Sequence, residues 1–345
     1  MNQTHSDAVV VDCHNDFVLL HARERWLGHT DSLVHRFVPQ LRKGGIDVQV
    51  TPIFIDHEFM PEAALRRTLL FIEHLREEVD ANPDAVALCD TGEAIDAAVA
   101  AGKLALVLAL EGSQAIGSDI ELFRTMFARG VRMASFTWMG NTALGGGSED
   151  GDPGAGLSRA GIEALRVLEE LGIVMDVSHL SARSTADVLE HTTRPLVASH
   201  SGARAINDHH RNIIDEHLKG IAATGGVIGV VAGIPSFIDP ATPTIDRVMD
   251  HILHIAETVG IDHVGIGADF CKEYFDEAFS TYPDIKWHGE DVRATIHGLE
   301  SPAEMPSLTA ALEARGLPRT DIAKVLGGNL LRVFREVMGK PDNKG

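Results

Sequence analysis

Residues 104–111 read Leu-Ala-Leu-Val-Leu-Ala-Leu-Glu, a run of seven apolar residues that ends in a carboxylate. A short run that is apolar at every position is typical of a strand buried on both faces, as in a parallel sheet covered by helices. Seven other short apolar segments have the same character. They are Val9–Cys13, Asp47–Ile55, Arg132–Phe136, Ile173–Val177, Pro195–Ala198, Gly226–Val231 and His263–Gly267.

Segments with the apolar spacing of an amphipathic helix alternate with these strands. They are Pro61–Val79, Gly92–Ala101, Ile120–Arg129, Gly161–Leu171, Ser181–Glu190, Asp215–Thr224 and Thr244–Val259. Thr91 and Ser181 suit N-cap positions, and Pro61 suits a first helical turn. Eight alternating units predict an α/β fold, a (β/α)8 TIM barrel, as one domain over residues 1–345. A doubly wound open sheet is the rival, but the first strand leads into Cys-His-Asn-Asp rather than a glycine-rich turn.

Three segments depart from this alternation. Gly140–Gly156 is rich in glycine and acidic residues and is predicted to be a long loop after the fourth strand. Phe270–Leu308 is irregular and is expected to cover the top of the barrel. Leu308–Met338 has a helical pattern that Gly327 and Gly328 interrupt, and Asn329 is expected to cap the last helix.

Composition excludes several classes of protein. The 345 residues include 50 acidic and 30 basic side chains, which gives a net charge of −20 and argues against nucleic acid or an anionic membrane as partner. Three scattered cysteines predict reduced thiols in a cytoplasmic protein. The polar N-terminus has no signal-peptide pattern, and no apolar run is long enough to span a membrane.

Polar residues follow the predicted strands, where the active sites of TIM barrels lie. Read in chain order, these strand ends carry His14, Asp16, Asp56, His57, Glu111, Trp138, His179, His200, Ser236 and Asp269. A single polar residue where a strand meets a loop carries little information. Five of the eight strands, however, end in His, Asp or Glu directly after an apolar run, and this recurrence indicates a shared site.

The residue types indicate a metal site. His14 and Asp16 alternate on an extended chain, so an imidazole and a carboxylate can bind one divalent ion. Glu111 ends an apolar strand, where a carboxylate is costly unless it is paired or bound to metal. His179 and His200 end consecutive strands about 4.8 Å apart, close enough to share an ion. The alternative for each residue is an ordinary hydrogen-bonded or solvated role.

Two further residues are candidates for contact with a substrate. Asp269 could accept a proton from bound water or hold an ammonium group; its alternative is the N-cap of a following helix. Arg211, in the polar loop Asn207–Asn212, could bind a carboxylate bidentately, although a solvated loop arginine would have the same sequence signature.

Several long motifs together resemble the membrane (renal) dipeptidases, peptidase family M19, over nearly the whole chain. The matching stretches, in order, are Asp12–Asp16, Glu111-Gly112, Gly130–Arg132, Leu171–His179, Ser199–Ser201, Arg211-Asn212, Gly260–Phe270 and Gly327–Phe334. The resemblance implies a TIM barrel of the metal-dependent hydrolase type, commonly a homodimer, that holds two zinc ions.

Carried onto these positions, the resemblance implies a role for each candidate residue. His14 and Asp16 would bind the first zinc ion, His179 and His200 the second, and Glu111 both. Asp269 would bind the substrate amine and transfer the proton from the attacking water to the leaving amine. Arg211 would contact the C-terminal carboxylate of the substrate.

One position departs from the family pattern. Trp138 follows Ser135-Phe136-Thr137, where better-known members have a histidine that contacts the substrate carbonyl, so Trp138 is a predicted substrate-binding residue.

The predicted function is a zinc-dependent dipeptidase for short dipeptides, including L-Xaa-D-Xaa, with a metal-bridging hydroxide as nucleophile. The alternatives are a binuclear amidohydrolase for another small amide, such as an N-acyl amino acid, and a non-catalytic binding protein with the same fold.

Overall fold

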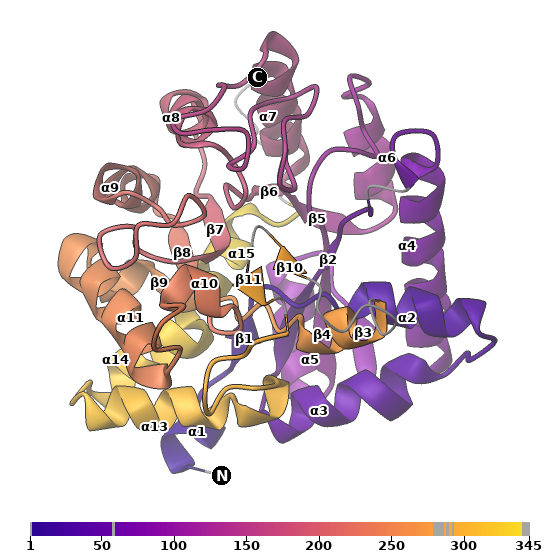
Figure 1. The fold of residues 1–345 in the computed structure, drawn as a ribbon. Coiled ribbons are helices and arrows are strands. Elements are labelled where there is room, and N and C mark those ends of the chain that lie inside the picture. The colour runs from indigo at the N-terminus through magenta and orange to yellow at the C-terminus, as the bar shows by residue number, and fades with distance from the viewer. Residues whose placement is uncertain (1, 57–58, 279–285, 288–289, 292, 340–345) are drawn as a thin grey trace.

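The computed structural model describes residues 2–56, 59–278, 286–287, 290–291 and 293–339. Within these ranges, parallel strands form a ring at the centre of the molecule (Figure 1). In ring order they are β1 (Val11–Asp12), β2 (Val48–Ile53), β4 (Leu104–Leu110), β5 (Val131–Ala134), β6 (Val174–Met175), β7 (Val197–Ser201), β8 (Val227–Val230) and β9 (Val264–Ile266). Backbone hydrogen bonds from Val177 to Val197 (2.9 Å) and from Cys13 to Ile266 (3.0 Å) join the two sheets into one ring. The predicted (β/α)8 barrel is confirmed.

Helices surround the ring on its outer side (Figure 1). Those between the strands are α2 (Phe17–Trp26), α3 (Val38–Lys43), α4 (Ala64–Ala81), α5 (Gly92–Ala100), α6 (Leu122–Ala128), α7 (Arg159–Leu171), α8 (Ala182–His191), α9 (Asp215–Ala223), α10 (Pro235–Ile238) and α11 (Ile245–Val259). Before and after the barrel lie α1 (Gln3–Asp7), α12 (Lys272–Ala278), α13 (Pro306–Ala314), α14 (Arg319–Ala323) and α15 (Asn329–Val337). A short hairpin, β10 (Lys286–Trp287) and β11 (Glu290–Asp291), lies between α12 and α13.

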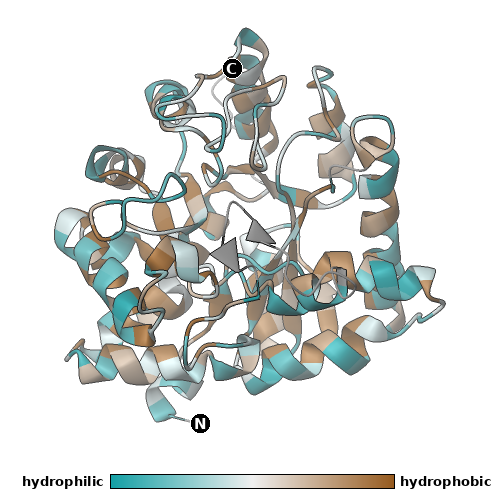
Figure 2. Cartoon of the chain, viewed as in Figure 1, coloured by the Kyte–Doolittle hydropathy of each residue, from teal (hydrophilic) through white to brown (hydrophobic). Residues whose placement is uncertain are grey.

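Strand β4 shows why the barrel forms. Its four leucines belong to the apolar core shared with the surrounding helices, whereas Ala105, Val107 and Ala109 belong to an inner cluster with Leu330 of α15. Successive side chains of a strand point to opposite faces, so small residues fill the barrel and large ones contact the helices. Glu111 continues the inward-facing row. Figure 2 shows the strands as predominantly hydrophobic and the helices as two-faced.

The predicted N-caps are confirmed: the side chains of Thr91 and Ser181 accept hydrogen bonds from the backbone of Ala94 and Ser184. The start of α4 was predicted wrongly at Pro61, because Phe59–Ala63 forms turns and the helix begins at Ala64. Strand β3 (Val86–Leu88) was missed. It is three residues long and pairs with β4 outside the ring.

The C-terminal segment is helical, but its details differ from the prediction. The chain continues through Gly327 and Gly328 as a π-helical turn, Lys324–Gly328, without a break. Gly327 is required by close packing, since a Cβ there would lie 2.2 Å from the carbonyl oxygen of Val9. Asn329 does not cap the helix; its amide donates to the carbonyls of Ile261 and Val264.

The segment from Phe270 to Leu308 is described in part, as α12, the hairpin strands, a 3₁₀ turn Pro302–Glu304 and the start of α13. His57, one of the strand-end candidates, lies outside the described residues.

Candidate metal centre

The polar residues predicted at the strand ends meet at the C-terminal face of the barrel. His14 and Asp16 follow β1, Glu111 follows β4, His179 follows β6, His200 lies in β7 and Asp269 follows β9. Each of the six is at most 8% exposed. Five strands therefore contribute to one buried cluster.

Two imidazoles contact one oxygen of Glu111. Its Oε1 lies 2.8 Å from His179 Nε2 and 3.7 Å from His200 Nε2. The two ring nitrogens are themselves 3.0 Å apart. Their convergence on one carboxylate oxygen places three candidate ligand atoms around a single point.

The other oxygen of Glu111 faces a second group. His14 Nε2 lies 3.6 Å from Glu111 Oε2, 3.5 Å from Asp16 Oδ1 and 4.0 Å from Asp269 Oδ1. Ligand atoms of His14, Glu111 and His200, and those of His14, Asp16 and Asp269, lie within 4.8 Å of one another. Glu111 thus lies between the two groups with one oxygen toward each.

The unpaired atoms of the cluster fit metal ions. Asp16 Oδ1 and Glu111 Oε2 are buried and lack a hydrogen-bond partner, which is unusual for carboxylate oxygens in a protein interior. Imidazole nitrogens and carboxylate oxygens are ordinary ligands of divalent transition metals. The cluster therefore provides two candidate sites for divalent metal that share Glu111.

Burial and the mutual repulsion of the carboxylates shift the ionisation of the cluster. Burial raises the pKa of Glu111 well above its usual value and that of Asp269 to about 7. Burial alone would lower the pKa of His14, but the neighbouring carboxylates, chiefly Glu111, raise it to about 10. Burial lowers the pKa of both His179 and His200, which favours the neutral imidazole that binds metal.

A hydrogen-bonded chain fixes the orientation of His200. Its Nδ1 lies 2.8 Å from Ser199 Oγ, and that hydroxyl donates to Asp176 Oδ2 over 2.5 Å. Asp176 Oδ1 accepts from the backbone of Ser178 and Ser199, 2.9 Å each. Because the Ser199 hydroxyl donates to Asp176, its oxygen accepts from Nδ1–H, and Nε2 keeps its lone pair for a metal.

Asp12 accepts backbone hydrogen bonds from two strand ends on the opposite side of the ring, as Asp176 does for β6 and β7. Its Oδ1 accepts from the backbone of Ala268 (2.8 Å) and His14 (3.3 Å), and so connects the ends of β9 and β1. Asp12, Asp176 and Ser199 are part of the sequence motifs that resemble the family, but the sequence alone indicated no role for them. Each lies one to three residues before a histidine of the cluster, and this position was the only available signal.

Two of the clustered residues have strained backbones. His179 and Asp269 have φ values of 66° and 56°, in the left-handed region that non-glycine residues seldom adopt. The Asp269 amide donates to the His14 carbonyl (3.0 Å), and the His179 carbonyl accepts from Thr137 Oγ1 (2.8 Å). These contacts hold a conformation that turns both side chains toward the cluster.

Arg211 lies next to the cluster and is 4% exposed. Its Nη2 donates to the His200 carbonyl over 3.4 Å, and its Nε is buried without a hydrogen-bond partner. Burial lowers the pKa of the guanidinium, while Asp269 and Glu111 oppose this shift. Arg211 and His179 line a small cavity of about 30 Å³, so an unsatisfied donor is available beside the candidate metal centre.

Trp138 lies outside the cluster. Its ring stacks on Phe54 with centroids 4.3 Å apart, and Phe54 contacts Tyr274 edge-on at 5.7 Å. The Tyr274 hydroxyl donates to Asp56 Oδ1 (2.6 Å), so this strand-end carboxylate has an aromatic partner instead of a place among the candidate ligands. Ser236, the remaining candidate, lies in α10 and is not part of the cluster.

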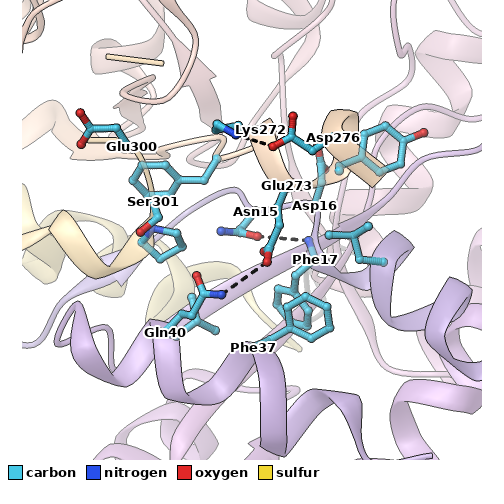
Figure 3. Close-up of a pocket in the computed structure, with 15 residues that line it drawn as sticks. Asn15, Asp16, Phe17, Phe37, Gln40, Lys272, Glu273, Asp276, Glu300 and Ser301 are labelled. Carbon is cyan, nitrogen blue, oxygen red and sulfur yellow. Dashed lines mark hydrogen bonds and ion pairs between the residues drawn. The ribbon is translucent and has the colours of Figure 1, made fainter. Parts of the chain in front are cut away.

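A larger cavity, of about 200 Å³, opens beside Asp16 (Figure 3). Phe270, which follows Asp269, also lines it. The remaining walls come from α2, α3, α12 and the turn before α13. The sequence did not reveal this cavity, because its walls are far apart in the chain.

Comparison with known proteins identifies the family. Residues 1–343 match the membrane dipeptidase family, peptidase family M19. The chain belongs to this family. It is therefore a hydrolase of the M19 metallo-dipeptidase family, as the sequence motifs implied.

Two curated relatives of this M19 chain are fungal dipeptidases. Dipeptidase verJ of Clonostachys rogersoniana is 28% identical over 96% of this chain and 85% of its own length. Dipeptidase tcpJ of Claviceps purpurea is 27% identical over 80% of this chain and 61% of its own length.

Solved structures share the fold of the M19 chain. One is described as dipeptidase AC of family M19, with a TM-score of 0.84 at 24% identity, over 96% of this chain and 99% of that one. A metallopeptidase from Rhodobacter sphaeroides, liganded with a phosphinate mimic of L-Ala-D-Ala, has a TM-score of 0.81 at 23% identity, over 96% and 99%. An amidohydrolase from Pseudomonas aeruginosa has a TM-score of 0.82 at 24% identity, over 98% and 99%. Among the described helices of the M19 chain, none combines the length and apolar character needed to cross a membrane.

We expect Ser199→Ala to weaken divalent-metal binding at the candidate centre about 10- to 100-fold, the usual effect of losing a partner that orients a ligand. Without the Ser199 hydroxyl, the His200 ring loses the acceptor that fixes its Nδ1–H. Competition with a chromophoric chelator would measure the dissociation constants. Ser184→Ala is the matched control, because Ser184 is also buried but bonds to Ala155 and Gly146 instead. Equal metal affinity in both variants would contradict the role given to Ser199.

Proposed function

We propose that the protein is a zinc-dependent dipeptidase that hydrolyses the peptide bond of short dipeptides, including L-Xaa-D-Xaa. The observation that carries this proposal is the buried Glu111, with one oxygen toward His179 and the other toward His14, in a chain of the M19 family. A carboxylate with an unpaired, buried oxygen at the shared position of two candidate sites suits a binuclear centre.

In this proposal the cluster divides into two ligand sets. His14 and Asp16 would hold one zinc ion, His179 and His200 would hold the other, and Glu111 would be a ligand to both. Bound there, the two ions would supply an activated water as nucleophile and polarise the scissile carbonyl. The chain Asp176–Ser199–His200 keeps one ligand in the required tautomer.

The remaining residues bind the substrate and move the proton. Asp269 Oδ1 lies 4.0 Å from His14 Nε2, beside the first ligand set. In this position it would accept the proton released by the attacking water and pass it to the leaving amine. Before reaction, the same carboxylate pairs with the N-terminal ammonium of the dipeptide. Arg211 donates to the C-terminal carboxylate through its unpaired Nε. Trp138, supported by Phe54, covers the substrate from the side of β5.

Three further predictions accompany this proposal. Residues 1–345 act as one barrel domain, the protein forms a homodimer, and it functions in the cytoplasm. The cytoplasmic assignment is supported by Cys13, Cys89 and Cys271, which are all buried free thiols.

Trp138 also supports a second candidate. An indole at this position cannot make the polar contact to the substrate carbonyl that the histidine of better-known family members makes, and it presents an apolar surface instead. An amidohydrolase acting on N-acyl amino acids would use the same metal centre and would bind the substrate carboxylate through Arg211. The acyl group would lie against Trp138 and Phe54.

A substrate screen separates the two candidates. Purified protein with added zinc is assayed against libraries of L-Xaa-L-Xaa, L-Xaa-D-Xaa and N-acetylated amino acids. We expect free dipeptides to be hydrolysed, because Asp269 requires a cationic partner, and the N-acylated compounds to be poor substrates. Turnover of N-acyl amino acids without turnover of dipeptides would contradict the dipeptidase proposal.

The role of Asp269 is tested by Asp269→Asn. The amide keeps the size of the side chain but cannot accept the proton, so kcat should fall about 10²- to 10⁴-fold. Zinc content, measured by mass spectrometry of the metal, should stay that of the wild type. Asp239→Asn provides a control, because Asp239 is a half-buried aspartate that pairs with Arg247 and lies outside the cluster. Unchanged turnover in Asp269→Asn would remove this residue from the mechanism.

A further inference from the structure

The larger cavity lies on one side of the candidate metal centre. Asp16 and Phe270 are among the residues that line it, and Figure 3 shows Asp16 at the cavity. The unpaired Oδ1 of Asp16 is buried, in a residue that is 7% exposed. The cavity holds about 200 Å³, more than ten times the ~15 Å³ that one water needs, so it has room for a whole side chain.

The barrel sets the direction in which a substrate reaches this cavity. Strands β9 and β1 are neighbours in the ring and carry Asp269 and Asp16, while β6 and β7, with His179 and His200, lie across it. Arg211 lines the small cavity on that far side. A dipeptide with its amine at Asp269 and its carboxylate at Arg211 therefore presents its N-terminal side chain to the larger cavity.

The deep part of this cavity is apolar. Phe17, Leu20, Phe37 and Leu41 line it, and each of them is at most 5% exposed. The rings of Phe17 and Phe37 contact each other, with centroids 5.2 Å apart. These side chains from α2, the turn before α3 and α3 itself provide a surface for a methylene chain or another apolar group.

Carboxylates surround the outer part of the cavity. Among the described residues that line it, Glu273, Asp276 and Glu300 are acidic and one is a cation, Lys272, which pairs with Asp276 (Figure 3). Glu300 bonds to the backbone of Gly298 (2.9 Å) and approaches a ring nitrogen of His297 (3.4 Å).

Neighbouring cations do not neutralise this rim. Arg36 Nη2 lies 3.2 Å from Glu273, but the same guanidinium also pairs with Glu24 and Glu277. Arg293 lies 3.3 Å from Asp276, which Lys272 also contacts. Arg23 also pairs with Glu277. With all these partners included, carboxylates still outnumber cations among the described residues, so the opening attracts positive charge.

We infer that this cavity binds the side chain of the substrate's N-terminal residue and selects one with a long apolar stem and a cationic end, as in lysine or arginine. The stem contacts the phenylalanine and leucine side chains, and the charged end reaches Glu273 and Glu300. Long basic side chains behave in this way at protein surfaces, burying their methylenes and keeping the charge in a polar environment. The inference rests on the dipeptidase function proposed above.

Two substrates that differ only in this charge test the inference. Norleucyl-alanine has the apolar stem of lysyl-alanine without its ammonium group. We expect kcat/KM of the wild-type zinc enzyme to be roughly 3- to 10-fold higher for lysyl-alanine, since partly exposed carboxylates stabilise a charge only modestly. Hydrolysis of both at equal kcat/KM, or a preference for norleucyl-alanine, contradicts this inference and leaves the dipeptidase function intact. Hydrolysis of neither contradicts both.

The double variant Glu273→Gln/Glu300→Gln identifies the residues responsible. Glutamine keeps the size of each side chain and the acceptor for Gly298, so the ratio of the two kcat/KM values should fall to about 1 to 2. Because both substrates are measured on one sample, the ratio does not depend on the fraction of protein that folds. Glu121→Gln, which removes an exposed partner of Arg124, should keep the wild-type ratio. An unchanged ratio of the two kcat/KM values in the double variant would show that Glu273 and Glu300 do not cause the preference for a cationic side chain.

Discussion

The carboxylate of Glu111 lies inside the barrel at the end of a wholly apolar strand. A buried carboxylate is strongly unfavourable unless other groups compensate its charge. Here Oε1 contacts His179 at 2.8 Å, while Oε2 is buried without a hydrogen-bond partner. The surrounding histidines and aspartates leave their own ligand atoms directed at the same space. The arrangement is stable when divalent cations satisfy these atoms, and the proposed chemistry depends on this constraint.

The rest of the barrel maintains this arrangement from outside the cluster. Asp12 connects the ends of β1 and β9, and Asp176 connects those of β6 and β7, on opposite sides of the ring. Each aspartate accepts backbone hydrogen bonds next to a candidate ligand, so the ligand positions follow from the strand ends and not from mobile loops. The left-handed backbones of His179 and Asp269 persist because these neighbours restrict them.

Much of this could be predicted from the sequence because parallel strands bring distant residues to one face. The apolar run at residues 104–111, and the alternation of eight such runs with helical segments, indicated the barrel, and the polar strand ends indicated the cluster. Asn329 was assigned wrongly, since a capping residue and a residue that bonds to a neighbouring turn look alike in sequence. The cavity beside Asp16 was not predictable, because Phe37 and Glu300 come together only through tertiary packing. Ser199 was missed because its role depends on two hydrogen bonds of its hydroxyl, one to Asp176 and one to His200, which only the folded structure shows.

The metal content of the purified protein tests the central claim most directly. After incubation with zinc and removal of loosely bound metal, elemental mass spectrometry should give two zinc ions per chain. Glu111→Gln should bind fewer, since an amide is a poor bridging ligand. A wild-type chain that holds less than one zinc ion after this treatment, with no other divalent metal in its place, would contradict the binuclear centre and the mechanism that rests on it.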